Sequence, residues 1–141
     1  IAEFTSIPNP YTLDDADRWL RFVEQTTGKH GELRQFAIRC EEELAGGFDF
    51  RHLHANDKAE VGYWLGSGFR GRGIMTKVLS AACRYARERW KLERLEALVY
   101  PHNQASILVL ERSGFRRKKL LENFYKRDGR LVDALLFTKT C

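Results

Sequence analysis

The residues best suited to chemistry are four glycines and two arginines at positions 66 to 73, in the stretch GSGFRGRG. The loop they form runs into an amphipathic helix. A helix N-terminus presents unpaired N–H groups and a partial positive charge, and glycine lets a ligand approach the backbone closely. The stretch therefore predicts an anion site in which Arg70 and Arg72 add charge.

Two phosphate-binding motifs fit this loop poorly. Gly66, Gly68 and Gly71 match the dinucleotide fingerprint G-x-G-x-x-G, but that motif needs a parallel strand–helix–strand unit, and an antiparallel meander is expected here. A Walker A loop is excluded because Arg72 and Gly73 stand where Lys and Ser or Thr are required. A glycine-rich turn that binds nothing stays open.

The elements before the loop can be read from capping residues and hydrophobic spacing. Residues 10–25 predict a helix with Thr12 as N-cap and Asp15 completing the cap. Residues 35–40, 44–53 and 59–65 read as strands joined by short polar turns. These three strands predict an antiparallel meander.

The elements after the loop alternate between helix and strand. Apolar positions at helical spacing predict a helix over 73–91, and 92–100 is strand-like. Asn103 can cap a short helix that Gly114 ends. Two further strands, 115–121 and 130–137, flank Asp128-Gly129, a strong hairpin signal. The pattern is that of one α+β domain.

Composition limits the partners. The chain has 141 residues, 43% of them hydrophobic and 30% charged, as in an ordinary globular domain. No apolar run approaches the roughly 20 residues that cross a bilayer, so no membrane partner is expected. The net charge of +5 favours nucleic acid or a phosphate-rich small ligand.

The cysteines indicate the redox state of the protein's compartment rather than a catalytic or metal-binding role. Cys40, Cys83 and Cys141 are odd in number and lack metal-ligand spacing, so we expect no metal and no disulfide framework. Cys83 falls on a partly apolar helix face and is expected to pack rather than react. Reduced cysteines predict a cytoplasmic protein.

The loop also resembles a known family. Arg70-x-x-Gly73 is similar to the R/Q-x-x-G-x-G/A signature of the GNAT N-acetyltransferases, although Met75 stands where Gly or Ala is usual. Nearly the whole chain resembles the RimJ/RimL-like branch, which acetylates N-terminal amines of ribosomal proteins. The matching stretches are PNPYTLDDADRWL, AEVGYWLG, RGRGIMTKVLSAACRYA, YPHNQAS and VLERSGF.

The resemblance implies a fold. We expect a mixed, mostly antiparallel sheet of about six strands with helices on both faces and a splayed central strand pair. The first strand and helix of the family normally precede a segment like the one with which this sequence begins. Residues 1–141 are therefore expected to be a single acetyltransferase domain that is incomplete at its N-terminus.

The resemblance also implies acetyl-coenzyme A as the acetyl donor, with its pyrophosphate on the loop amides. The positive charge then needs no nucleic acid to explain it. The expected partners are acetyl-coenzyme A and an amine, bound by a monomer or a homodimer. The coenzyme-binding residues implied are Leu65, Phe69, Arg70, Gly71, Arg72, Gly73, Ile74, Met75 and Asn103.

Acetyl transfer to an amine needs a neutral nucleophile, a place for the developing oxyanion and a proton for the leaving thiolate. The resemblance puts the Ser106 hydroxyl near the coenzyme sulfur and Asn103 near the pantetheine arm; otherwise the two are a first-turn residue and an N-cap. Glu60 is the candidate base or acceptor-positioning group, or else a solvated strand residue. Glu122 is a weaker base, and His102 is more typical of a turn.

We expect direct transfer in a ternary complex, and the resemblance implies a protein N-terminal amine as acceptor. A small-molecule amine, or a non-catalytic module that binds coenzyme A, are the alternatives. The positive charge disfavours a highly basic acceptor, unless the acidic residues Glu41 to Glu43, Asp49 and Glu60 form a local patch.

Overall fold

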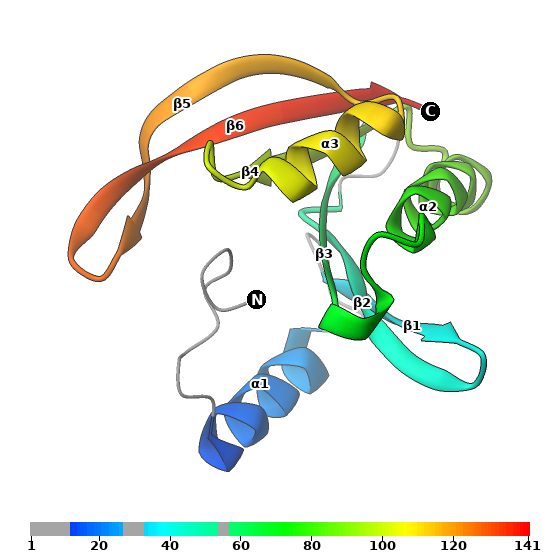
Figure 1. The fold of residues 1–141 in the computed structure, drawn as a ribbon, viewed down its shortest axis with the longest axis vertical. Coiled ribbons are helices and arrows are strands. Elements are labelled where there is room, and N and C mark those ends of the chain that lie inside the picture. The colour runs from blue at the N-terminus through cyan, green and yellow to red at the C-terminus, as the bar shows by residue number, and fades with distance from the viewer. Residues whose placement is uncertain (1–11, 27–32, 54–56) are drawn as a thin grey trace.

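The computed structural model describes residues 12–26, 33–53 and 57–141. These residues form three helices and six strands, with one short 3₁₀ turn in the glycine-rich loop (Figure 1). Their bounds are α1 Leu13–Thr26, β1 Arg34–Cys40, β2 Glu43–Arg51, β3 Lys58–Leu65, η2 Ser67–Phe69, α2 Ile74–Trp90, β4 Arg94–Val99, α3 Gln104–Arg112, β5 Arg116–Arg127 and β6 Arg130–Thr140.

Local signals set most of these bounds. The Asp15 N–H donates to Thr12 Oγ1 at 3.2 Å, and the Thr12 N–H donates to Asp15 Oδ2 at 2.9 Å, which is the predicted reciprocal cap of α1. The first two residues of the predicted helix, 10 and 11, lie outside the described residues. Asp128 and Gly129 both have positive φ and form the expected hairpin turn. β5 and β6 are longer than predicted, since they continue to Arg127 and Thr140.

The sheet has the strand order β1-β2-β3-β4-β6-β5. Every neighbouring pair is antiparallel except β3 and β4, which run parallel. The predicted meander and the mixed, mostly antiparallel sheet are therefore confirmed. The dinucleotide-binding alternative is wrong, because it requires a parallel sheet.

The central strand pair separates where the loop begins. β3 and β4 pair only over residues 58–60 and 94–96, so the rest of each strand has no partner on that side. The predicted splay is confirmed. It leaves a gap between the end of β3 and the end of β4, and α3 lies beside that gap in Figure 1.

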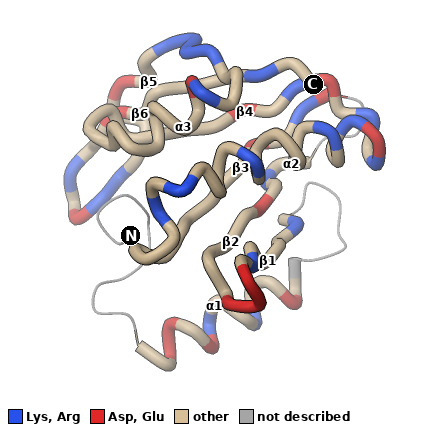
Figure 2. The backbone as a smooth tube through the Cα atoms, turned by 45° about the vertical axis from the view of Figure 1, so that its right-hand side comes forward, with Lys and Arg blue, Asp and Glu red and all other residues tan. Residues whose placement is uncertain are grey.

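The helices cover both faces of the sheet. In Figure 2, α1 lies below the β1–β2 hairpin and α2 above it. The inner faces of α2 and α3 join the sheet in one hydrophobic core, whose largest fully buried side chains are Phe50, Phe137, Leu79, Leu92, Leu95 and Leu110. Within the described ranges, no helix is both long and apolar enough to cross a bilayer.

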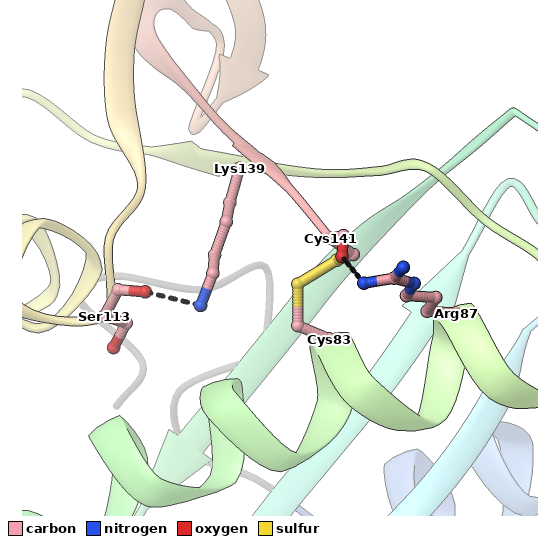
Figure 3. Close-up of a disulfide and its surroundings, with 5 residues drawn as sticks. All are labelled: Cys83, Arg87, Ser113, Lys139 and Cys141. Carbon is pink, nitrogen blue, oxygen red and sulfur yellow. Dashed lines mark hydrogen bonds between the residues drawn. A yellow bond between two sulfur atoms is a disulfide. The ribbon is translucent and has the colours of Figure 1, made fainter.

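The expectation of unpaired cysteines is wrong for two of the three. Cys83 on α2 forms a disulfide with Cys141, which follows β6, and Figure 3 shows the bond between the helix and the strand end. The Arg87 guanidinium donates to the Cys141 carbonyl at 3.2 Å beside it. Sequence spacing could not predict this pair, because the sheet brings together two residues that are 58 positions apart. Cys40 is free, as expected. Cys83 is buried, as its expected packing role requires.

Candidate functional site

Glycines shape the loop between β3 and α2. The Gly66 N–H donates to the Ala45 carbonyl on β2 at 2.9 Å, and the Phe69 N–H donates to the Gly66 carbonyl at 3.1 Å. Gly71 and Gly73 then adopt φ of +72° and +71°, in the left-handed region that a side chain disfavours. Gly73 is the N-cap of α2 and offers no capping side chain. The first backbone N–H groups of α2 are therefore not covered by a capping side chain.

The backbone N–H groups of residues 71–76 form a cluster of unused donors. None of them donates to an acceptor elsewhere in the part of the chain that the structure describes. A Cβ added at Gly68, Gly71 or Gly73 would meet no heavy atom within 4 Å, so the space beside the loop is open. Unpaired N–H groups at a positive helix end are what an anion requires. The loop therefore has the features of an anion site.

A cavity of about 270 Å³ extends from this loop to α3, and we call it the loop cavity. Every predicted coenzyme-binding residue except Arg72 lines this cavity. Those residues are Leu65, Phe69, Arg70, Gly71, Gly73, Ile74, Met75 and Asn103. The Arg72 guanidinium instead turns away, 3.7 Å from the Glu41 carboxylate and 5.9 Å from the centroid of the Phe69 ring.

Ser106 lies where α3 closes this cavity. Its N–H donates to Asn103 Oδ1 at 3.2 Å, so Asn103 is the N-cap of α3 and also lines the cavity. The Ser106 hydroxyl is 2.7 Å from the Tyr63 hydroxyl, across the gap between β3 and α3. Burial raises the pKa of Tyr63 to about 12, although the hydrogen bond to Ser106 opposes the rise. Tyr63 therefore keeps its proton at neutral pH, and either hydroxyl of the pair can be the donor.

A second cavity, of about 220 Å³, lies on the other side of Ser106, and we call it the Glu60 cavity. It shares Tyr63, Asn103 and Ser106 with the loop cavity. Side chains from separate strands complete it, among them Arg51 on β2 and Tyr125 on β5. The two cavities meet at the hydroxyl pair.

Arg51 is fixed beside Glu60. Its Nε and Nη2 atoms donate to the Asp49 carboxylate at 2.6 Å and 3.1 Å, and its Nη1 atom is 3.9 Å from Glu60 Oε1. A Cβ at Gly62 would lie 2.8 Å from Asp49 Oδ1 and would also contact the Arg51 guanidinium. Gly62 therefore provides the room in which this ion pair sits.

Burial raises the pKa of Glu60 above its ordinary value, and the charge of Arg51 offsets only part of the rise. Burial and the nearby Glu60 carboxylate likewise raise the pKa of Tyr125 to about 12. A partly buried carboxylate with a raised pKa suits a general base.

The acidic patch considered from the sequence is not assembled. Residues 41–43 lie at the β1–β2 turn and line neither cavity. Asp49 is held by Arg51, so Glu60 is the one carboxylate among the residues that line the Glu60 cavity.

Sequence reasoning missed Tyr63, Arg51 and Tyr125. Tyr63 had a usable signal, because it lies two residues after buried Val61 and therefore on the same face of β3, where it puts a polar tip on the inward side. Tyr125 had none: an irregularity of the β5–β6 pairing between Leu121 and Tyr125 changes the register there.

Two weaker candidates lie outside the site. Glu122 is exposed on β5, and His102 stacks on Tyr100 in the turn before α3 with 5.8 Å between ring centroids. Neither lines the two cavities. Among the described residues, no three His, Cys, Asp or Glu side chains are grouped to hold a metal ion.

The sequence is similar to known acetyltransferases. Ribosomal-protein-serine acetyltransferase of Escherichia coli is 30% identical over 139 residues, which cover 89% of this chain and 75% of that protein. The uncharacterized N-acetyltransferase p20 of Bacillus licheniformis is 32% identical over 111 residues, or 77% of this chain. The chain spans 62% of the length of p20 in that match.

Solved structures agree in fold. Mycobacterium smegmatis RimJ, in complex with CoA-disulfide, superposes with a TM-score of 0.81 at 29% identity. The match covers 92% of this chain and 63% of that one. The sequence profile of the acetyltransferase (GNAT) domain matches residues 1–116, which is most of the chain. The chain belongs to the GNAT acetyltransferase family.

Proposed function

We propose that the protein is an acetyl-coenzyme A-dependent N-acetyltransferase whose acceptor is the N-terminal amine of a protein. The observation that carries this proposal is the meeting of the two cavities at Ser106 and Tyr63. One cavity offers unpaired amides to an anion, and the other offers a carboxylate with a raised pKa. Relatives named as ribosomal-protein acetyltransferases support the choice of acceptor.

Acetyl-coenzyme A supplies an acetyl group as a thioester. In our proposal, the amides of residues 71–76 hold its pyrophosphate, and the lining from Leu65 to Ser106 takes the pantetheine arm. Asn103 and Met75 border that path. The remaining steps are assigned to side chains of this protein.

Glu60 accepts a proton from the incoming ammonium, directly or through water, so that the neutral amine can attack the carbonyl carbon. When the carbon–sulfur bond breaks, the Ser106 hydroxyl gives its proton to the leaving sulfur. Ser106 regains a proton from the attacking nitrogen, which must lose one to become the amide, so both the free thiol and the neutral serine result. In our proposal Tyr63 is the donor in the 2.7 Å contact between the two hydroxyls, which leaves the Ser106 hydrogen to point toward the loop cavity. No cysteine is among the described residues that line either cavity, which favours direct transfer over an acetyl-cysteine intermediate.

The test combines thiol release with mass spectrometry. Protein, acetyl-coenzyme A and peptides beginning with Ser or Ala should release thiol and gain one acetyl group at the N-terminus. Initial rates should give intersecting double-reciprocal lines, because both substrates bind before chemistry; parallel lines would indicate an acetyl-enzyme. Acetylation of small amines and never of peptides would contradict the acceptor. Coenzyme binding without turnover on either class would indicate a non-catalytic module.

We also infer that the protein acts in the cytoplasm, where ribosomal proteins are made. Support comes from the Escherichia coli relatives that modify such proteins. The Cys83–Cys141 bond favours an oxidising compartment and argues against it. Alkylation of the cysteines during cell lysis distinguishes the cytoplasm from an oxidising compartment. Three alkylated cysteines agree with a reduced cytoplasmic protein, and alkylation of Cys40 alone contradicts a cytoplasmic location.

A further inference from the structure

The charges around the Glu60 cavity are unbalanced. Its lining includes the cationic side chains of Arg51, Lys126 and Arg127 against the single carboxylate of Glu60. Arg51 is already matched by Asp49. Arg127 Nε lies 3.8 Å from the exposed Asp128 carboxylate, so the unmatched positive charge of the lining is that of Lys126 on β5, the strand at the edge of the sheet.

Lys126 and Arg127 are placed to meet the part of an acceptor that follows its amine. They end β5 at the hairpin turn, opposite Leu131 and Arg130. Lys126 is exposed and makes no ion pair with another described residue. The Arg127 guanidinium lies 5.7 Å from the Tyr100 ring centroid, on the wall of the cavity. Figure 2 shows Lys and Arg continuing along β5, whereas Asp and Glu gather on α1 and the β1–β2 turn.

This arrangement disfavours basic acceptors. A polyamine or a Lys-rich peptide would bring several positive charges to a cavity with one carboxylate. An extended chain advances about 3.3 Å per residue, so the second and third residues of a peptide pass the cavity mouth while its amine is at Glu60.

We propose that the acceptors are protein N-termini whose second to fourth residues are acidic. Lys126 recognises the acidic side chains, and Arg127 adds to the positive rim. This inference rests on the proposed function, since it names the class of amine that the Glu60 cavity takes. Because Lys126 is exposed, its contribution should weaken with salt.

The experiment compares three peptides that start with the same Ser and continue with Asp and Glu, with Gln, or with Lys. Thiol release should give the highest kcat/KM for the acidic peptide and the lowest for the basic one. Each step should be about threefold to fivefold at low salt, which is the size an exposed charge pair supports. Raising the salt concentration should shrink the differences.

A charge-reversal pair assigns the effect to the cavity. Lys126→Glu should remove or invert the preference for the acidic peptide. Lys118→Glu makes the same change in net charge on the same exposed strand but outside both cavities, and should keep the preference.

Equal, non-zero rates on the three peptides would overturn this inference and leave the proposed function standing. An equal effect of the two substitutions would also overturn it, because net charge and not the cavity would then set the preference. Spermidine acetylated faster than every peptide would overturn it together with the choice of a protein acceptor. No thiol release with any amine would defeat the proposed function itself.

Discussion

The loop cavity and the Glu60 cavity meet at one hydroxyl pair but are built differently. Most of the loop cavity comes from one continuous stretch, residues 63–76, and its principal donors are backbone amides. The Glu60 cavity is built from side chains of β2, β3, β4, α3 and β5. A backbone site can be read from a short motif, whereas a side-chain site across five elements depends on strand register. The family signature therefore describes the donor side and says little about the acceptor.

The largest effect should come from disturbing the backbone site. Gly73→Val puts a branched side chain at φ +71° beside the unpaired amides. In the free variant the loop can relax by moving residue 73 out of the left-handed region, so binding must restore strain of about 2 kcal/mol. Together with the loss of a charge-assisted hydrogen bond of about 2 kcal/mol, this predicts roughly 1000-fold weaker binding of acetyl-coenzyme A. Titration calorimetry measures the affinity.

A matched variant controls for strain. Gly129 has φ +76° and open space around its Cβ position, but it lies in the β5–β6 turn. Gly129→Val should cost similar stability and leave coenzyme affinity unchanged. Unaltered affinity in Gly73→Val, or an equal loss in both variants, would show that the loop does not hold the coenzyme.

The next largest effect is expected at Glu60, where a substitution should impair catalysis at the Glu60 cavity without changing coenzyme binding in the loop cavity. Glu60→Gln should lower kcat/KM for the amine about 100-fold, the scale of general-base catalysis, with coenzyme affinity unchanged. Glu122→Gln is the control, because Glu122 is exposed on β5 and lines neither cavity. A larger loss in Glu122→Gln than in Glu60→Gln would move the base to the other carboxylate.

The raised pKa of Glu60 gives this prediction a pH dependence. A base works when deprotonated, so kcat/KM should rise with pH through a value above the ordinary 4.5, and Glu60→Gln should lack that rise. Proton binding also favours the folded state when the folded pKa is the higher one. The free energy of unfolding should therefore fall in the wild type, relative to Glu60→Gln, as pH rises from 4.5 through the folded pKa. An identical pH dependence of stability in both proteins would contradict the shift.

The part of the fold that local signals encode was predictable. The Thr12–Asp15 cap and the Asp128-Gly129 turn each form within a few residues, and both are confirmed. Hydrophobic spacing located α2 and the three-strand meander. The position of the glycine loop at the start of α2 was predictable for the same reason, because glycines and a helix N-terminus act through the backbone at their own positions.

What could not be predicted depends on pairing over long distances. Arg51 lies opposite Glu60 only through the register of β2 on β3. Tyr125 reaches the cavity because the β5–β6 pairing shifts at Asn123, whose N–H donates to Asp133 Oδ1 at 2.8 Å. The Cys83–Cys141 bond likewise requires β6 to end beside α2. None of these pairs has a spacing that the sequence alone would reveal.

A smaller effect is expected at the junction of the cavities. Tyr63→Phe keeps the ring and removes the hydroxyl that lies 2.7 Å from Ser106. The loss of one hydrogen bond, about 1 kcal/mol, predicts a fall in kcat of about fivefold, with KM for acetyl-coenzyme A unchanged. Ser106→Ala should cost more, and Tyr63→Phe should add little in the Ser106→Ala background. Fully additive losses would show that Tyr63 does not act through Ser106.

The smallest effect should be at Arg72, the one predicted coenzyme-binding residue that does not line the loop cavity. Its guanidinium pairs with exposed Glu41 instead. Exposed ion pairs contribute at most about 1 kcal/mol, so Arg72→Ala should change coenzyme affinity by less than about fivefold. Arg70 does line the cavity, and its Nε donates to the Leu65 carbonyl at 3.1 Å, so Arg70→Ala should weaken binding more. Calorimetry at low and high salt compares the two variants. A larger loss for Arg72→Ala would mean that its side chain leaves Glu41 when the coenzyme binds, and that the loop cavity relies on side-chain charge as well as on backbone amides.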